Sequence, residues 1–195
     1  MNALVSHLTS AGELLESAGL WDDLWARSDV TSPTLQAGLI AQWLGHFCPA
    51  GRRQSGTNAF HALIVEEQGR WLAALPLVEK RSAGVVRMGA WPANQWSDSG
   101  DLLLDPAVAP QPVLDALVQA MESLPWQALR LGDVPIATSR WQQTTAALER
   151  AALPYHFRPE MQPGRIDTRG DWESYQQTWS RRHRQQVTRH LRALS

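Results

Sequence analysis

One stretch of the sequence gathers side chains that are suited to holding a polar ligand. Residues 89–105 read GAWPANQWSDSGDLLLD and lie between two apolar runs. Indole rings, an amide and carboxylates in one loop suit a ligand that both stacks and hydrogen-bonds, such as a sugar or a peptide. The candidate substrate-binding residues are Trp91, Asn94, Trp96, Asp98 and Asp101. The alternative is a structural turn, because Asp and Ser bond their own backbone in turns and tryptophans can close the end of a sheet.

Signatures of the common catalytic classes are absent from the sequence. It contains no Walker sequence, no G-x-G-x-x-G, no H-E-x-x-H and no C-x-x-C. The six histidines form no zinc-binding motif, so we expect no metal. No G-x-S-x-G elbow presents a serine nucleophile, which argues against a hydrolase. The sequence therefore identifies no catalytic residue.

The last sixteen residues, SRRHRQQVTRHLRALS, predict a basic amphipathic helix. Val187, Leu191 and Leu194 fall on one side of it, and five arginines with no acid occupy much of the rest. Such a helix could contact phosphates or pack its apolar stripe against another part of the protein. An isolated helix of about fifteen residues is marginal without packing, and the acidic chain before it repels nucleic acid. We therefore expect packing, and no nucleic-acid partner.

The elements expected around these residues predict a mixed α/β fold. Helices are expected over residues 10–27, 32–47, 110–124, 139–153 and 171–179, with caps at Ser10, Ser32, Ser139 and Asp171. Two apolar runs around the turn Glu67-Gln68-Gly69-Arg70 predict a β-hairpin. Further strands are expected over residues 84–91, 101–105 and 127–134, and an irregular, proline-interrupted strand over 155–168.

Composition limits the class of protein. A chain of 195 residues with 44% hydrophobic and 19% charged residues suffices for one packed domain. The single cysteine, Cys48, excludes an internal disulfide framework. No apolar run reaches the roughly 18 residues of a membrane helix, and the N-terminus lacks the apolar region of a signal peptide. We expect a soluble cytoplasmic protein without a membrane span.

The order of elements, the WSDSGDLLLD stretch and the S-R-R-x-R-x-x-V-x-R-x-L-R-x-L ending resemble one family. The chain is similar, over nearly all of its length, to the first half of the bacterial CelD/BcsL-type acyltransferases. These are GNAT-superfamily proteins related to the Fem aminoacyltransferases, in which two GNAT-like domains follow each other. The resemblance implies a largely antiparallel GNAT-like sheet flanked by helices. It also implies an N-terminal domain over residues 1–178 and, from 179, a helix leading into a second domain that this chain lacks. The residues that match the interdomain helix motif include Arg181, Arg184, Val187 and Leu191.

The resemblance implies an acyl- or acetyltransferase that uses acyl-CoA, held mainly by the second domain, and acts on an amine or hydroxyl of a sugar or peptide. In a cofactor-binding GNAT domain, a glycine-rich turn after the fourth strand cradles the pyrophosphate. The matching stretch here, LLLDPAVAPQPV, has no glycine, and Pro106, Pro110 and Pro112 remove three N–H donors. Asp105 adds a negative charge. We therefore expect this fragment alone to be inactive; the alternative is a non-catalytic binding module that uses the Trp-rich loop or the basic helix.

Overall fold

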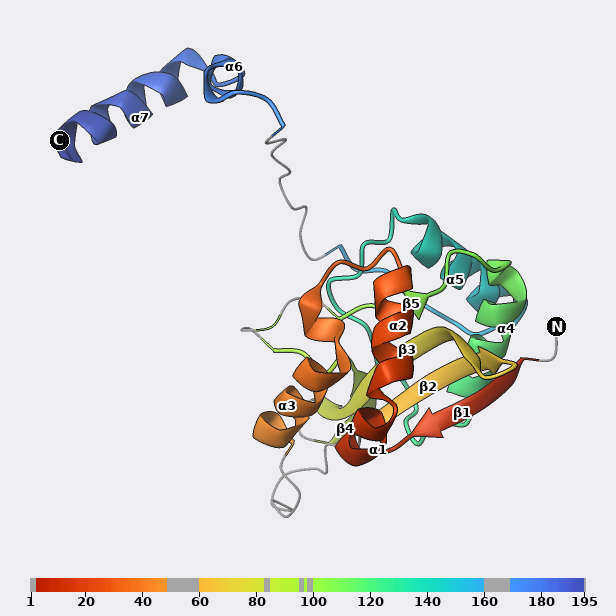
Figure 1. Cartoon of the computed structure of the whole chain (residues 1–195). Coiled ribbons are helices and arrows are strands. Elements are labelled where there is room, and N and C mark those ends of the chain that lie inside the picture. Colours follow the sequence, from red (N-terminus) through yellow and green to blue (C-terminus); the bar gives the residue numbers. More distant parts are fainter. Residues whose placement is uncertain are drawn as a thin grey trace. The chain divides into compact units, whose positions relative to one another are not determined.

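The computed structural model describes residues 3–48, 60–82, 85–94, 97, 100–159 and 169–194. The chain divides into two compact units, Met1–Arg158 and Pro159–Ser195. The first unit is a mixed α/β domain whose sheet is mostly antiparallel and flanked by helices (Figure 1), so the predicted fold class is confirmed. None of the described helices is both long and apolar enough to span a bilayer.

The sheet of the first unit has one parallel edge. Its strands are β1 (Leu4–Leu8), β2 (Phe60–Glu67), β3 (Arg70–Ser82), β4 (Val86–Ala90), β5 (Leu103–Leu104) and β6 (Leu129–Arg130). They lie in the order β1-β2-β3-β4-β6, and β5 also pairs with β3. Every pairing is antiparallel except β4 with β6, which is parallel. β4 and β5 therefore lie along the same edge of β3, and residues 91–102 connect them.

The predicted hairpin between β2 and β3 is confirmed. Glu67 pairs with Arg70, and the two residues between them have left-handed backbone angles, with φ of 53° at Gln68 and 78° at Gly69. Two successive positive φ values are typical of a type I′ turn, which matches the twist of the strands that it joins.

Helices cover both faces of the sheet and form two cores. Their bounds are α1 (Ala11–Glu16), α2 (Ala18–Arg27), η1 (Pro33–Leu35), α3 (Ala37–Phe47), α4 (Pro110–Met121) and α5 (Ser139–Arg150). One core joins α1 to α3 with sheet residues such as Ala62 and Ile64. The other joins α4 and α5 with residues of the opposite face, such as Leu63 and Leu75. Successive residues of β2 belong to different cores, because successive side chains of a strand point to opposite faces of the sheet.

Some predicted boundaries were wrong. The helix expected over residues 10–27 is interrupted at Ser17, where α1 ends and α2 begins. A 3-10 turn follows Ser32, and the main helix α3 starts only at Ala37. The strand β1 was not predicted, because its apolar residues Leu4 and Val5 lie on an exposed edge. The strand expected over 127–134 contains two residues, and the described residues 153–159 form no strand.

The second unit contains two described helices, α6 (Trp172–Gln177) and α7 (Arg181–Leu194). The predicted cap at Asp171 is confirmed, since its side chain accepts a hydrogen bond from the N–H of Ser174 at 2.7 Å. Aromatic rings gather where the two helices meet: Trp179 packs edge-to-face on Trp172 at 5.4 Å and on His183 at 4.7 Å. Ring contacts therefore hold α6 against the first turn of α7.

Candidate functional site

The carboxyl ends of the parallel strands β4 and β6 are bridged by one indole. Trp91 directly follows β4, and its Nε1–H donates to the carbonyl of Gly132, just beyond β6, at 3.0 Å. In sheets with parallel strands, ligands bind at the carboxyl ends, so this is where a binding cleft is expected. Trp91 is 3% exposed and packs edge-to-face on Trp141 of α5, with 6.1 Å between the ring centroids. The indole thus fills the space between the two strand ends.

The connection between β4 and β5 closes back on its own first residue. A Cβ atom added to Gly100 would lie 2.3 Å from Cγ of Trp91, which is closer than any real contact. The backbone of Gly100 therefore lies directly on the indole, and only glycine allows this approach. Both ends of the connection are packed together at the edge of the sheet.

Asp101 ties the end of this connection to α5. Its Oδ1 accepts hydrogen bonds from the N–H of Leu102 and from Nε1 of Trp141, each at 2.8 Å. Its Oδ2 accepts from Nη2 of Arg140 at 2.6 Å. Burial raises the pKa of Asp101 to about 6, against the hydrogen bonds from Leu102 and Trp141, which lower it. This carboxyl group therefore titrates close to neutral pH.

Arg140 is shared between two carboxylates. It lies in the first turn of α5, is 5% exposed, and pairs with Asp29 as well as with Asp101. Burial lowers the pKa of its guanidinium, and its Nε is buried without a hydrogen-bond partner among the described residues. The cluster of Trp91, Asp101, Arg140 and Trp141 links the end of β4, the start of β5 and α5.

The predicted substrate-binding residues therefore have different surroundings. Trp91 and Asp101 lie in one cluster, although Trp141 connects them rather than a direct contact. The backbone N–H of Asn94 donates to Oγ of Ser97 at 2.8 Å, which is a turn interaction. Trp96 and Asp98 lie outside the described residues. A ligand contact by any of these residues stays a prediction.

Arg140 and Trp141 were missed as members of this cluster. Their sequence signal was the stretch Ser139-Arg140-Trp141, which was interpreted only as the start of a helix. A large aromatic and a cation at a helix start give no indication of the partner, because the partner lies about 40 residues away in the sequence. Tertiary contacts of this kind are not encoded in local spacing.

The turn from β5 into α4 has a different arrangement, centred on Asp105. This carboxylate is 1% exposed and accepts hydrogen bonds from Nη2 of Arg70 at 2.6 Å and from the N–H of Ala107 at 2.9 Å. Arg27 of α2 also donates to it. Burial alone would raise the pKa of Asp105, but the bond from Ala107 and the two guanidinium groups hold it below its usual value.

This turn does not fit a pyrophosphate group. The carboxylate of Asp105 already accepts from the N–H of Ala107 and from both arginines, so the turn already contains one paired anion. Pro110 and Pro112 lie within the first turn of α4 and carry no N–H. A helix N-terminus attracts anions through its free N–H groups, so the two prolines leave this one with fewer donors for a cofactor phosphate.

The basic helix α7 forms where it was predicted. Within the predicted stripe, Leu191 is 58% exposed, whereas Val187 is half-buried. Nη1 of Arg184 donates to the carbonyl of Gln177 in α6 at 3.4 Å, and Arg181 is exposed. No group of three or more His, Cys, Asp or Glu side chains able to hold a metal ion occurs in the part of the chain that the structure describes.

The chain is similar in structure to several solved proteins, two of which are acetyltransferases. No family model and no curated protein matches the sequence. An aminoglycoside acetyltransferase from an uncultured soil metagenomic sample, in complex with sisomicin, is 9% identical with a TM-score of 0.47; the match covers 85% of this chain and 97% of that one. A ribosomal-protein-alanine N-acetyltransferase from Brucella melitensis biovar Abortus 2308 is 13% identical with a TM-score of 0.43, covering 85% and 99%. An integron cassette protein from the mobile metagenome of V. cholerae is 12% identical with a TM-score of 0.41, covering 87% and 94%.

Proposed function

We propose that this chain is the N-terminal GNAT-like domain of a CelD/BcsL-type acyltransferase, and that a second domain, which the chain lacks, holds the acyl-CoA. The enzyme would transfer an acyl group to an amine or hydroxyl of a sugar or peptide. The observation that carries the proposal is the turn into α4, where Asp105 pairs with Arg27 and Arg70 and two prolines open the helix. A domain with this element order but without the cradle is suited to shaping the acceptor side of a cleft.

The parallel edge of the sheet supports the assignment of the class. A meander of antiparallel strands ends in β4, and β6 pairs with β4 in parallel after a helical crossover. The resemblance implies a largely antiparallel sheet flanked by helices, with which this arrangement agrees. The residues at the carboxyl ends of β4 and β6 include the connection from Trp91 to Asp101, which we assign to the acceptor side.

The helix α7 supports a second domain. Its apolar stripe includes Val187 and Leu191, and Leu191 is 58% exposed. Burying an aliphatic side chain stabilises a protein by roughly 1.5–3 kcal/mol, so an open stripe on a helix of this length favours a packing partner. We assign that partner to the GNAT-like domain that would follow in the same polypeptide.

Coenzyme binding tests whether the second domain, rather than this one, holds the acyl-CoA. We expect the 195-residue chain to show no micromolar binding of acetyl-CoA in calorimetric titration, because the turn after Leu104 offers no cradle. The same chain extended by the sequence encoded downstream in its gene should bind acetyl-CoA and transfer the acetyl group to an amine. Micromolar binding by the short chain that is lost on a bulky substitution at Pro106 would contradict the proposal. An extended chain without a GNAT-like domain or transferase activity would favour a binding module.

Hydrogen exchange tests the role of α7. In the isolated chain, we expect residues 181–194 to be the least protected of the helices, because Leu191 of the stripe is 58% exposed. In the extended chain, the same amides should become protected. Strong protection of α7 in the monomeric short chain would show that the stripe already has its partner within the 195 residues.

The acceptor contact is tested at Asp98 in the extended, active protein. A carboxylate flanked by indoles can accept hydrogen bonds from acceptor hydroxyls or an amine. We expect Asp98→Asn to raise the KM for the acceptor or to lower kcat, with little change in melting temperature. A lower melting temperature with unchanged kinetics would leave Asp98 as a structural turn residue.

A further inference from the structure

The chain has one thiol and one side-chain amine, and its fold brings the two together. They belong to Cys48 and Lys80, the only cysteine and the only lysine of the 195 residues. Cys48 caps the C-terminal end of α3, is half-buried, and packs against the core that contains Val78. Lys80 comes two residues after Val78 in β3, so it lies on the same face of the sheet. The thiol and the ammonium are near enough to interact electrostatically.

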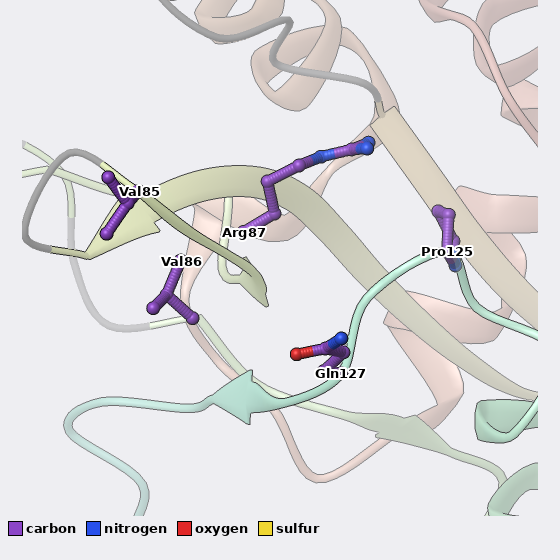
Figure 2. A pocket seen from close by; sticks show the side chains of 5 residues that line it. All are labelled: Val85, Val86, Arg87, Pro125 and Gln127. Carbon is purple, nitrogen blue, oxygen red and sulfur yellow. The ribbon is translucent and has the colours of Figure 1, made fainter.

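The ammonium of Lys80 has no carboxylate partner within the described residues. None of the salt bridges among them includes it. The adjacent acid, Glu79, lies on the other face of the sheet, where it pairs with Arg87 of β4. Lys80 lies opposite Met88, and therefore on the face of Val86. Figure 2 shows Val86 and Arg87 pointing to opposite sides of β4. No carboxylate of the described residues therefore holds this amine in its protonated form.

A hydrogen bond to the backbone orients this amine. Nζ of Lys80, on an exposed side chain, donates to the carbonyl of Ala93 at 2.8 Å. A neutral amine can donate to a carbonyl as an ammonium does, so the bond can persist while the nitrogen presents a lone pair. Partial burial lowers the pKa of Lys80, Cys48 raises it, and Arg130 lowers it again, with a lowered pKa as the net result. The nucleophilic form is therefore more populated than in an ordinary lysine.

We propose that Lys80 is an acylation site, and that Cys48 receives the acyl group from a thioester such as acyl-CoA and passes it to Lys80. Thiolates are the stronger nucleophiles toward a thioester, whereas the amide is the more stable product. A thiol beside an amine raises the rate of amide formation, because the second transfer takes place within one molecule. The thioester reacts from solution and needs no coenzyme site in this domain, so the modification does not depend on the proposed function.

Both transfers conserve atoms and electrons. In the first, Sγ of Cys48 bonds to the carbonyl carbon, the bond from that carbon to the coenzyme sulfur breaks, and the coenzyme leaves as a thiol with the proton of Cys48. In the second, Nζ of Lys80 bonds to the same carbon, the bond to Sγ breaks, and a proton from the nitrogen returns to Sγ. The products are an amide on Lys80 and a free thiol at Cys48, and no oxidant or reductant takes part.

Acylation removes the positive charge from the group that holds the carbonyl of Ala93. Ala93 belongs to the connection between β4 and β5, which we assign to the acceptor side. The modification therefore weakens the attachment of this connection to β3. That consequence, unlike the modification itself, rests on the proposed function.

The test is mass spectrometry of the 195-residue chain after incubation with millimolar acetyl-CoA, in the presence of Nα-acetyl-lysine as a reference amine. We expect the side chain of Lys80 to be acetylated at least about tenfold faster than the reference amine. Acetylation of Lys80 no faster than that of the reference amine would overturn the proposal. A lasting thioester on Cys48 with Lys80 unmodified would overturn it as well.

Variants separate the relay from a direct attack by the amine. Lys80→Arg should accumulate a thioester on Cys48 that hydroxylamine removes, because the guanidinium stays protonated and does not attack it. Cys48→Ala should slow the acetylation of Lys80 to the rate of the reference amine. If Cys48→Ala unfolds the chain, a methylthio disulfide on Cys48 of the wild-type chain blocks the same thiol and should slow the reaction equally. Arg150→Gln, at an exposed arginine paired with Asp115, is the control and should leave the rate unchanged. An unchanged rate at Lys80 with Cys48 replaced or blocked would refute the relay.

Discussion

Asp105 and Asp101 lie four residues apart on either side of β5, and both are buried carboxylates paired with arginine. Their acidities are shifted in opposite directions. The pKa of Asp105 lies below its usual value, whereas burial raises that of Asp101 to about 6. Asp105 contacts two guanidinium groups, of which Arg27 also pairs with Asp23, while Asp101 shares the single guanidinium of Arg140 with Asp29. At Asp105 the hydrogen bond from Ala107 and the two arginines outweigh the effect of burial on the pKa, whereas burial prevails at Asp101.

The difference separates a structural anchor from a candidate site. The turn at Asp105 joins α2, β3 and α4 through Arg27 and Arg70, and its charges are paired. The cluster at Asp101 contains a carboxyl group that titrates near neutral pH and an arginine whose Nε has no described partner. Titratable groups with perturbed pKa values are enriched at functional sites. Of the two carboxyl groups, Asp101 is therefore the more readily protonated.

The largest effect is expected at the anchor. Asp105→Asn removes the carboxylate charge that Arg27 and Arg70 contact, and because each hydrogen bond to a charged group contributes about 1.5–3 kcal/mol, we expect a loss of about 3 kcal/mol of unfolding free energy. Chemical denaturation measures the loss. Asp115→Asn, in an exposed pair with Arg150, is the control and should cost under about 1 kcal/mol. An Asp105→Asn variant as stable as that control would show that the turn is not an anchor and would remove the contrast with Asp101.

Local patterns predicted much of the fold. The hairpin, the strand at 84–91, the short strand before Asp105, and α4 with its buried Val113 and Leu117 were all predicted from periodicity and turn residues. The exposed strand β1 and the break at Ser17 were not, because neither has a strong local signal. The parallel pairing of β4 with β6 rests on two residue pairs, Gly89 with Leu129 and Ala90 with Arg130, and no spacing in the sequence specifies it.

The candidate site could be located from the sequence but not assembled. Aromatic and acidic residues in one loop marked the connection from Trp91 to Asp101. The role of Asp101 depends on Arg140 and Trp141, which are distant in sequence, and Trp91 depends on the carbonyl of Gly132. The sequence located the negative charge of Asp105 in the turn before α4. It did not predict the two arginine partners, which come from α2 and from the hairpin. Pairings of this kind arise only when the elements pack.

A second effect is expected at the base of the connection. Gly100→Ala would place a Cβ atom 2.3 Å from Cγ of Trp91, so the indole or the backbone must move. Overpacking of this kind typically costs about 1–3 kcal/mol. Gly132→Ala is the matched control, because a Cβ there meets nothing within 4 Å. Equal unfolding free energies of the two variants would indicate that the backbone at Gly100 shifts at little cost, and that its packing on Trp91 contributes little to stability.

The smallest effect at neutral pH is expected for Asp101→Asn. An amide oxygen can still accept from Leu102 and Trp141, and only the bond from Arg140 to Oδ2 is lost. Because the folded chain already disfavours the ionised form, removing the charge should change the unfolding free energy at pH 7.5 by only about 1 kcal/mol. The loss should be several-fold smaller than that of Asp105→Asn.

The pH dependence of stability provides the sharper comparison of the two carboxyl groups. The pKa of Asp101 rises from 3.8 to about 6 on folding, so between these values the folded chain binds more protons than the unfolded one. Its contribution to the unfolding free energy must therefore fall as the pH rises from about 4 to about 6, and then level off. Asp105 contributes in the opposite direction, because its pKa is lowered on folding. Its stabilisation is present above the pKa of the unfolded chain and is lost as the pH falls through the pKa of the folded chain.

Denaturation curves from pH 3 to pH 8 test this comparison. We expect Asp101→Asn to remove the decline in unfolding free energy between about pH 4 and pH 6 and to leave the loss of stability at lower pH unchanged. If the unfolding free energy of the variant declines between pH 4 and pH 6 as that of the wild type does, Asp101 is ionised in the folded chain throughout this range. Both carboxyl groups would then be ionised in the folded chain.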